Sequence, residues 1–516
     1  MGRTILMENY ILVYILVIPS LAALALLLFP AENKKLLRWG AFGFSLIPFL
    51  LSLNVWFNFN REINGYQFEF QAPWFSAISS SFHFGVDGIS LPMVLLTTLL
   101  TPLAILASFG IEEKIKAYMA LFLFLETGVL GVFLSLDLLI FFLFWEIGLV
   151  PMYFLISQWG GANRNYAALK FILFTMGGSL GLLLSIQMIG LTVGSFDLVK
   201  VMEVWPRLLE PGFQQIIPLG LSLPTVKAIA FWAFVIAFAI KVPIWPVHTW
   251  LPDAHTEAPT AGSMILAGVL LKLGAYGFIR LVIPLFPTEA YRFSGVLAGL
   301  ATAAIIFGAL SAFAQKDLKK LVAYSSINHM GFVVLGIAAA SYAWGNPDSA
   351  YGISATIALN GSILQMFNHG LSSAGMFFLV GVIYDRIHTR QLDEMGGLWA
   401  IVPKYGAVFM FTAMAALGLP GLNGFVSEFL VVRGAWHIFP LATSLSMVGL
   451  FFTGAYILKA IAGVLQGPIN EHWHHIPEIN VRELWVIAPL MVLMLWIGVW
   501  PSWILDLINR AVNFFF

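Results

Sequence analysis

Residues 237–276 read AFAIKVPIWPVHTWLPDAHTEAPTAGSMILAGVLLKLGAY, and they place two lysines inside apolar sequence. Lys241 is followed at once by Pro243 and Pro246, so its apolar run cannot continue as one helix, because proline lacks a backbone donor and clashes with the preceding turn. Lys272 lies near the middle of the next apolar run. A charge beside a helix break at membrane depth is costly and indicates a functional site. The alternative is a lysine that extends to the membrane surface beside a harmless kink.

The composition is that of a polytopic membrane protein without a soluble domain. Of 516 residues, 60% are hydrophobic and 10% are charged, whereas soluble chains have about 25% charged residues. The net charge of zero gives no basic face for nucleic acid. The absence of cysteine excludes disulfides, thiolate metal sites and thiolate-ligated iron–sulfur clusters in this sequence. Neither a dinucleotide-binding glycine motif nor a phosphate-binding loop is present.

Apolar runs long enough to cross a hydrocarbon core of about 30 Å recur along the whole sequence. They predict an all-α fold of about fourteen transmembrane helices. The runs lie at residues 10–29, 36–57, 88–109, 116–134, 137–157, 169–194, 227–249, 263–286, 293–313, 320–341, 353–384, 405–435, 441–466 and 484–510. Residues 58–87 and 195–226 are too polar to span and are predicted to be loops, the second with a short amphipathic helix at 197–209.

The distribution of basic residues predicts the orientation of these spans. Assigning the loops to alternate sides places more Lys and Arg on one side, including Lys34, Lys35, Arg38, Lys319 and Arg390. By the positive-inside rule this side is cytoplasmic, and both termini are then external.

A second apolar span is also interrupted. Residues 418–424 read GLPGLNG, and Glu428 follows within the same apolar run. Two broken spans, each with an ionisable residue beside the break, favour an internal repeat of the kind found inverted in ion transporters, with the site at the unwound backbone. The alternative is that glycine and proline are simply common in membrane helices.

Six titratable residues lie at similar depth in six different spans. Glu146, Lys272 and His329 are each about nine residues, or ~13 Å, into their spans, counting 1.5 Å per residue. His369 lies near the middle of its span, and Lys241 and Glu428 lie beside the two breaks. Any one of them could be a hydrogen-bonded core residue, but six at one depth favour a polar row across the protein.

The chemistry of this row favours protons over sodium. Burial brings the pKa values of lysines and carboxylates toward neutrality, and histidine titrates there without help. Sodium prefers a cage of oxygen ligands, whereas most members of this row are lysine or histidine.

Several long motifs resemble the antiporter-like membrane subunits of respiratory complex I. The motifs are FHFGVDGIS (82–90), FWEIGLVPMY (144–153), IKVPIWPVHTWLPDAHTEAPTAGS (240–263), LLKLGAYG (270–277), KDLKKLVAYSSINHMG (316–331), YDRIHTR (384–390) and LGLPGLNGFVSEF (417–429). The M type, or chain four, is the most similar, because Glu428 stands where the L and N types usually carry lysine.

The resemblance implies a proton-translocating, non-redox subunit of an NADH:quinone oxidoreductase, fed by NADH or a related donor. It implies an N-terminal group of helices at 1–115, inverted repeats at 116–286 and 292–467, and a final loop and helix at 468–516. Glu146 and Lys241 would form an ion pair, Lys272 a central relay, His329 and His369 later relays, and Glu428 the far terminus.

The resemblance also implies what surrounds the chain. NADH, flavin, iron–sulfur clusters and quinone would bind to other subunits, and this chain would hold no cofactor or metal. Its partners would be other membrane subunits, including the L and N types, within the lipid bilayer of an energy-transducing membrane. That membrane would be a bacterial plasma membrane or a thylakoid.

Three other interpretations use the same sequence features. They are an Mrp-type cation/proton antiporter subunit, a proton-pumping subunit of a membrane-bound hydrogenase, and a structural subunit that no longer pumps. The buried lysines and glutamates argue against the last, because a passive scaffold has no reason to bury them.

Some polar residues are assigned structural roles. Asp137 is a candidate helix N-cap as well as a match to an acidic position of the family. Asp253, His255 and Glu257 are expected to line the polar turn after the first break, and Lys459 to lie at a helix end outside the row. The cluster Glu471, His472, His474 and His475 lacks the helical spacing of a metal site.

Overall fold

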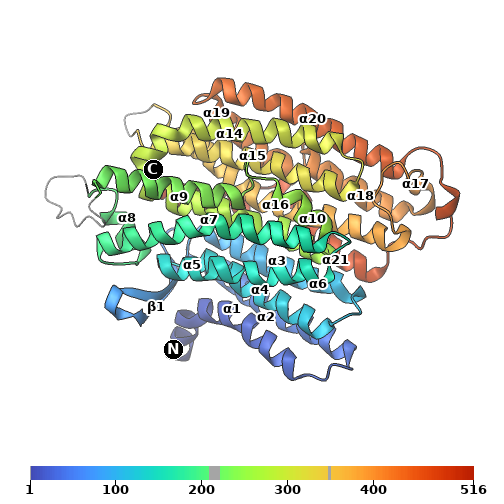
Figure 1. Ribbon diagram of the computed structural model, residues 1–516, viewed down its shortest axis with the longest axis horizontal. Helices are drawn as coiled ribbons and strands as arrows, with labels where there is room; N and C mark the ends of the chain where they lie inside the picture. Colours follow the sequence, from blue (N-terminus) through green and yellow to red (C-terminus); the bar gives the residue numbers. More distant parts are fainter. Residues whose placement is uncertain (1, 209–220, 347–349, 516) are drawn as a thin grey trace.

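The computed structural model describes residues 2–208, 221–346 and 350–515, and long helices running in nearly the same direction make up most of it (Figure 1). The helices are α1 (Gly2–Leu28), α2 (Lys34–Asn58), α3 (Ser90–Ala107), α4 (Ile115–Leu134), α5 (Leu138–Ile147), α6 (Leu149–Trp159), α7 (Arg164–Val193), α8 (Leu198–Val204), α9 (Leu223–Lys241), α10 (Trp250–Glu257), α11 (Thr260–Ile265), α12 (Leu271–Gly277), α13 (Ile283–Leu285), α14 (Pro287–Ala314), α15 (Leu318–Trp344), α16 (Gly352–Ile387), α17 (Leu398–Ile401), α18 (Pro403–Leu417), α19 (Asn423–Trp436), α20 (Pro440–Leu465), α21 (Val481–Val499) and α22 (Ser502–Phe515).

The number of spans agrees with the prediction. Among the described residues, 13 helices are long and apolar enough to cross a membrane. The broken span made of α18 and α19 adds another crossing, because each half is too short by itself. The fold class predicted from the sequence, a polytopic all-α membrane protein with two broken helices, is therefore confirmed.

Both predicted breaks occur where proline or glycine interrupts an apolar run. Helix α9 ends at Lys241, and an irregular turn that contains Pro243 and Pro246 leads to the short helix α10. Helix α18 ends at Gly418, whose φ of 84° closes the helix in the left-handed conformation that glycine adopts without steric cost. Gly421, with φ of 94°, continues the turn before α19 begins at Asn423.

Burial differs strongly between the spans and defines the centre of the bundle. In the most apolar stretch of Thr260–Leu285 and of Gly352–Ile387, 100% of the residues are buried, and 94% are buried in α15. The corresponding share is 28% in α2 and 33% in α21. Helices α11–α13, α15 and α16 therefore form the interior, and α2 and α21 lie at the periphery.

Two parts of the sequence fold differently from the prediction. The loop at 58–87 contains an antiparallel hairpin, β1 (Gln67–Phe75) and β2 (Ser80–Val86). The last predicted span, 484–510, is two helices, because Pro501 interrupts it between α21 and α22. The predicted amphipathic helix near 197–209 is present as α8, and Leu209 lies outside the described residues.

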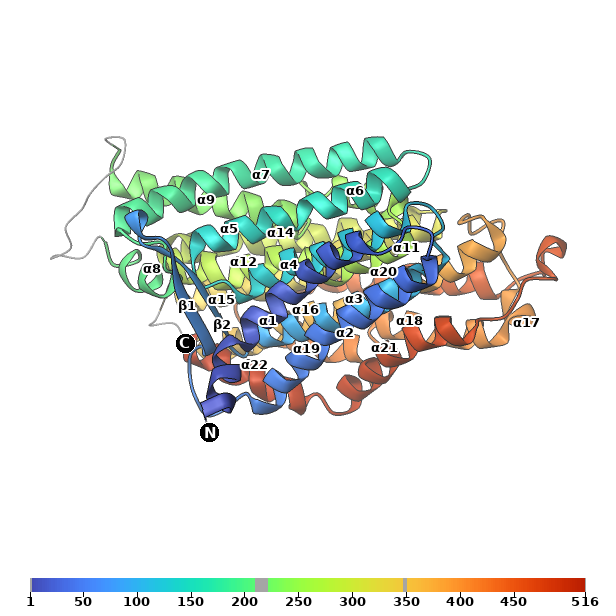
Figure 2. The ribbon, with the colours of Figure 1, turned by 90° about the horizontal axis from the view of Figure 1, so that it is seen from below.

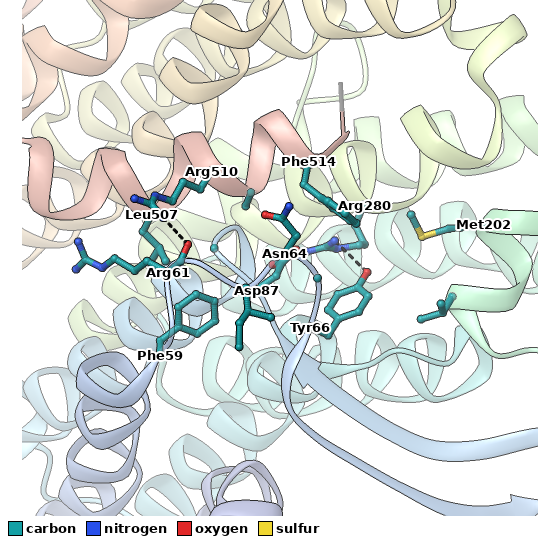
Figure 3. Close-up of a pocket in the computed structure, with 15 residues that line it drawn as sticks. Phe59, Arg61, Asn64, Tyr66, Asp87, Met202, Arg280, Leu507, Arg510 and Phe514 are labelled. Atoms are coloured by element: carbon teal, nitrogen blue, oxygen red, sulfur yellow. Dashed lines mark hydrogen bonds and ion pairs between the residues drawn. The ribbon is translucent and has the colours of Figure 1, made fainter.

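The hairpin, α8 and α22 lie at one end of the bundle, where α1 begins and α22 ends (Figure 2). A pocket of about 140 Å³ between them is lined by Asn64, Met202 and Arg510, among others (Figure 3). In the wall of this pocket, buried Arg280 donates to Asp87 at 2.6 Å and to the Tyr66 hydroxyl at 3.1 Å. These bonds connect the end of the bundle to the π-helical turn Phe278–Val282, which belongs to a central span.

Candidate functional site

Four of the six predicted site residues form one connected line in the interior. Lys272 Nζ lies 2.7 Å from His369 Nδ1. The rings of His369 and His329 have centroids 5.6 Å apart, and His329 Nδ1 lies 2.7 Å from Glu428 Oε1. All four residues are at most 5% exposed. The line crosses α12, α16, α15 and α19, so it joins the central span after the first break to the helix after the second.

Lys272 lies in an irregular part of its span. The span contains π-helical turns at Leu266–Leu270 and Phe278–Val282, one on each side of α12. Such turns are frequent at functional sites, because their wider winding displaces carbonyl groups from the regular pattern. The ammonium of Lys272 donates to the carbonyl of Ala267 within the first of these turns. The fold thus gives a buried lysine one backbone acceptor and one histidine acceptor.

Polar side chains that surround Glu428 and His329 were missed by the sequence analysis. Gln365 Nε2 donates to Glu428 Oε1 at 2.9 Å. The hydroxyl of Tyr456 lies 3.2 Å from His329 Nε2. Ser427, next to Glu428, accepts from Asn368 Nδ2 at 2.9 Å. Amide and hydroxyl groups give no charge signal in a sequence, so only the folded structure shows that they belong to this site.

A small cavity adjoins the two histidines. It has a volume of about 10 Å³ and is lined by His329, His369, Ser325, Ser372 and other residues. That volume is near the minimum that one water molecule requires, and the lining offers several hydrogen-bonding groups. His369 Nε2 is buried and has no hydrogen-bond partner in the described part of the chain. The site therefore has room and an unsatisfied ring nitrogen for a water beside the line.

Glu146 and Lys241 lie close together without a direct ion pair. Lys241 Nζ lies 4.6 Å from the centre of the Trp145 ring and interacts electrostatically with Glu146. Neither Lys241 Nζ nor Glu146 Oε1 has a hydrogen-bond partner, and no contact within 4.0 Å joins the two charges in the described part of the chain. The structure thus places the two predicted partners near each other, with no ion pair between them in the described residues.

The two parts of the row meet where α12 packs on α9. A Cβ atom at Gly274 would lie 2.7 Å from the carbonyl oxygen of Phe238, so the two backbones are in direct contact there. Phe238 is one helical turn before Lys241, and Gly274 is two residues after Lys272. Lys241 and Lys272 therefore lie on helices whose backbones touch, although no hydrogen bond between side chains joins Lys241 to Lys272 in the residues described.

Asp137, Asp253 and Glu257 make hydrogen bonds and ion pairs that hold local structure. Asp137 caps α5 by accepting from Leu139 N at 2.9 Å, and it also accepts from Ser80 Oγ. Asp253 pairs with Lys170 at 2.7 Å, and Glu257 accepts from Asn163 N at 2.9 Å. Both acidic residues thus fasten the polar turn to the start of α7.

Two further residues of that group differ in burial, since His255 is buried and Lys459 is half-buried. His255 is completely buried, and its ring stacks on Phe377 with centroids 4.5 Å apart. Lys459 donates to the carbonyl oxygens of Phe313 and Gln315 at 2.6 and 2.7 Å, so it caps the end of α14.

Two buried ionisable residues were missed, although the rule applied to the row would have found them. Glu126 lies within α4, is 2% exposed, and neither carboxyl oxygen has a hydrogen-bond partner among the residues that the structure describes. Arg280 is 1% exposed in the same span as Lys272. A charged residue inside an apolar run was the available signal in both cases.

The geometry defines a class of protein. A membrane bundle with two broken spans and a buried line of lysine, histidine and carboxylate side chains is the architecture of antiporter-like ion-translocating subunits. Two family models match the chain: "NADH:quinone oxidoreductase/Mrp antiporter, TM" over residues 135–453, and "NADH-ubiquinone oxidoreductase chain 4, amino terminus" over residues 11–136. The chain therefore belongs to the chain 4, or subunit M, family of NADH:quinone oxidoreductases.

Individual relatives agree with this family. NADH-quinone oxidoreductase subunit M of Rickettsia conorii is 40% identical over 503 residues, which cover 96% of each chain. A chain of respiratory complex I from Thermus thermophilus has a TM-score of 0.83 and 29% identity, and the match covers 98% of this chain and 99% of that one. A chain of the Mrp complex from Dietzia sp. has a TM-score of 0.82 at 21% identity, covering 98% of this chain and 97% of that one, which shows a shared fold.

Proposed function

We propose that this chain moves protons across the membrane as a non-redox subunit of an NADH (or related donor):quinone oxidoreductase, which makes the assembled enzyme a translocase. The observation that supports it is the buried line from Lys272 through His369 and His329 to Glu428, with contacts of 2.7 Å at both ends. Each of these groups can bind and release a proton, and each is costly to bury without such a role.

The six residues have distinct roles in this proposal. Glu146 and Lys241 form a switch, because a lysine held apart from its carboxylate loses its proton more readily than one in an ion pair. Lys272 receives the proton, and His369 and His329 pass it on. Glu428, beside the second break, delivers it to water held by the open backbone on the external side.

The same proposal includes the companion subunits, the membrane and the internal repeats of the chain. Electrons pass from NADH to quinone through flavin and iron–sulfur clusters on companion subunits, and L- and N-type chains are the neighbours in the membrane. The chain lies in an energy-transducing membrane, a bacterial plasma membrane or a thylakoid, with both termini external. Residues 116–286 and 292–467 are the two inverted repeats, between an N-terminal group at 1–115 and a terminal part at 468–516.

An Mrp-type antiporter subunit is the second candidate, because one matching family model includes Mrp antiporters and the folds are alike. Identity favours the first candidate, at 40% to a subunit M against 21% to the Mrp chain. A hydrogenase subunit would use the same row with another electron donor. Purification of the assembled complex, followed by identification of its companion subunits, distinguishes the three.

The proposal is tested by replacing Lys272 in the intact complex. Lys272→Met keeps the length of the side chain and removes its proton site, so proton uptake into reconstituted vesicles should fall about tenfold or more. Lys459→Met removes a lysine that caps α14 and should leave uptake near the original level. Normal uptake by the Lys272→Met variant, at equal assembly, would contradict the proposal.

A further inference from the structure

A long apolar groove is lined by residues of α2, α3 and α21. Figure 2 labels these three helices. One part has a volume of about 590 Å³ and the adjoining part about 410 Å³, and both are lined by Phe49 and Leu99. The two parts therefore form one continuous groove. It lies at the periphery of the bundle, on the two helices in which the smallest shares of residues are buried.

The groove is long enough to cross most of the hydrocarbon core of a membrane. Its wall on α2 is formed by residues that recur every three or four positions: Trp39, Phe42, Leu46, Phe49, Leu53 and Trp56. This spacing keeps them on one face of a helix. From Trp39 to Trp56 the helix rises about 25 Å at 1.5 Å per residue, which is close to the ~30 Å of a hydrocarbon core.

Basic residues stand at one mouth of the groove, on the side where α2 begins. Arg482, at the start of α21, lines the groove. Lys35 is exposed and precedes Trp39 by four residues, so it lies on the same face of α2 one turn closer to the mouth. Neither side chain makes a hydrogen bond or ion pair within residues 2–208, 221–346 and 350–515.

Most of the neighbouring charges are already paired among the described residues. Lys34 and Arg38 each contact Glu112 at 2.6 Å, and Glu483 pairs with Arg386 at 2.7 Å. Arg482 also faces Asp385, with which it interacts electrostatically across an adjacent polar cavity. Trp39 and Trp485 lie at the same mouth, and tryptophan prefers the level of the lipid headgroups.

We propose that this groove binds an anionic phospholipid of the leaflet on that side, with its phosphate between Lys35 and Arg482 and an acyl chain against α2, α3 and α21. The lining is apolar away from the mouth, as an acyl chain requires. A groove of this volume is suited to a ligand rather than to another membrane helix, which is about 10 Å across. Two unpaired cations at the mouth select a negative headgroup.

The test uses the intact complex in nanodiscs that contain phosphatidylglycerol with a photoreactive group on its acyl chain. Mass spectrometry should locate the label on α2, α3 and α21, near Phe42, Leu103 and Trp485. Lys35→Gln and Arg482→Gln should each lower labelling roughly fivefold, which is the effect of one basic residue near a membrane surface. Lys34→Gln, which removes the neighbouring paired lysine, should leave labelling unchanged.

A second variant tests the apolar part of the site. Leu103→Trp on α3 fills the groove and should reduce labelling while both basic residues remain. Equal labelling by photoreactive phosphatidylcholine would contradict a site for anionic lipid. Unchanged labelling in a Lys35→Gln/Arg482→Gln double variant, or exclusive labelling of a companion subunit's helix in the groove, would also overturn the proposal.

Discussion

Lys241 contacts the face of the Trp145 ring at 4.6 Å and has no hydrogen bond to the carboxylate of Glu146. An aromatic face stabilises a cation without taking its proton. The lysine can therefore stay close to its carboxylate partner without being fixed in an ion pair. This arrangement suits a switch in which small movements change the interaction between the two charges.

At this pair we expect strong non-additivity. Glu146→Ala and Lys241→Ala should each lower proton pumping about tenfold, which is within the ~100-fold that a positioned proton-transfer group supplies. The double variant should pump no less than the weaker single variant, because both changes disable one switch. Pumping is measured in reconstituted vesicles and normalised to assembled complex. Two fully active single variants would remove the pair from the proton route.

The position of each site residue could be predicted, but its contacts could not. A charge in an apolar run is visible in the sequence, and this signal found Lys272 and Glu428. The contacts join residues 97 positions apart, between Lys272 and His369, and 99 positions apart, between His329 and Glu428. Such pairs depend on how the helices pack, and local sequence carries no information about that.

Among the secondary-structure elements, the helix breaks at proline and glycine were predicted correctly, whereas the two strands were not predicted. The breaks after Lys241 and at Gly418 follow from the backbone requirements of these residues. The hairpin was missed although QFEFQ at 67–71 alternates polar and apolar residues, as a strand does. Pro501 likewise indicated an interruption of the last span, but the sequence analysis treated residues 484–510 as one helix.

The hairpin is joined to the start of α8 by a histidine with two acidic partners. His83 Nδ1 lies 2.6 Å from Asp197 Oδ2, and Nε2 lies 3.0 Å from Glu69 Oε2. Burial alone would lower the pKa of His83, but the hydrogen bonds and charges of Asp197 and Glu69 outweigh it, so the pKa is raised above its ordinary value. The contact is therefore strongest when the histidine is protonated.

This contact predicts that the stability of the hairpin and of α8 depends on pH. Because the folded pKa is raised, the stabilisation is complete below the ordinary pKa of histidine and is lost as pH rises through the raised value. Hydrogen exchange in β2 and α8, corrected for intrinsic rates, should be slower at about pH 6 than at about pH 9. His83→Gln should abolish the difference. Equal protection of the unmodified protein at both values would contradict the prediction.

In the whole molecule, the buried line crosses the middle of the bundle, and the loops lie at its two ends. The hairpin, α8 and α22 share one end (Figure 2). At the polar turn after the first break, Arg390 donates to Thr256 O at 2.7 Å and Lys319 to Ala258 O at 2.5 Å. These contacts gather basic residues around one turn, and the orientation predicted from the sequence places that turn on the cytoplasmic side.

Accessible tags test this division. Tags at Asn33 and at exposed Lys316, in the loop before buried Lys319, should be accessible only from the cytoplasm. A tag at Asn64, beside α22, should be accessible only from outside. Labelling of intact cells and of inverted vesicles gives the two accessibilities. Finding Asn64 and Lys316 on the same side would contradict the arrangement of spans.

The central claim is that protons leave the buried line through Glu428, and one measurement tests it most directly. Proton uptake by vesicles containing the Glu428→Gln complex is compared with that of the unmodified complex at equal quinone reduction. Glutamine can keep hydrogen bonds to His329 and Gln365 but cannot ionise, so uptake should fall about tenfold, while Glu428→Asp retains part of it. Full uptake by the Glu428→Gln complex would show that Glu428 is a structural residue and that the proton route lies elsewhere.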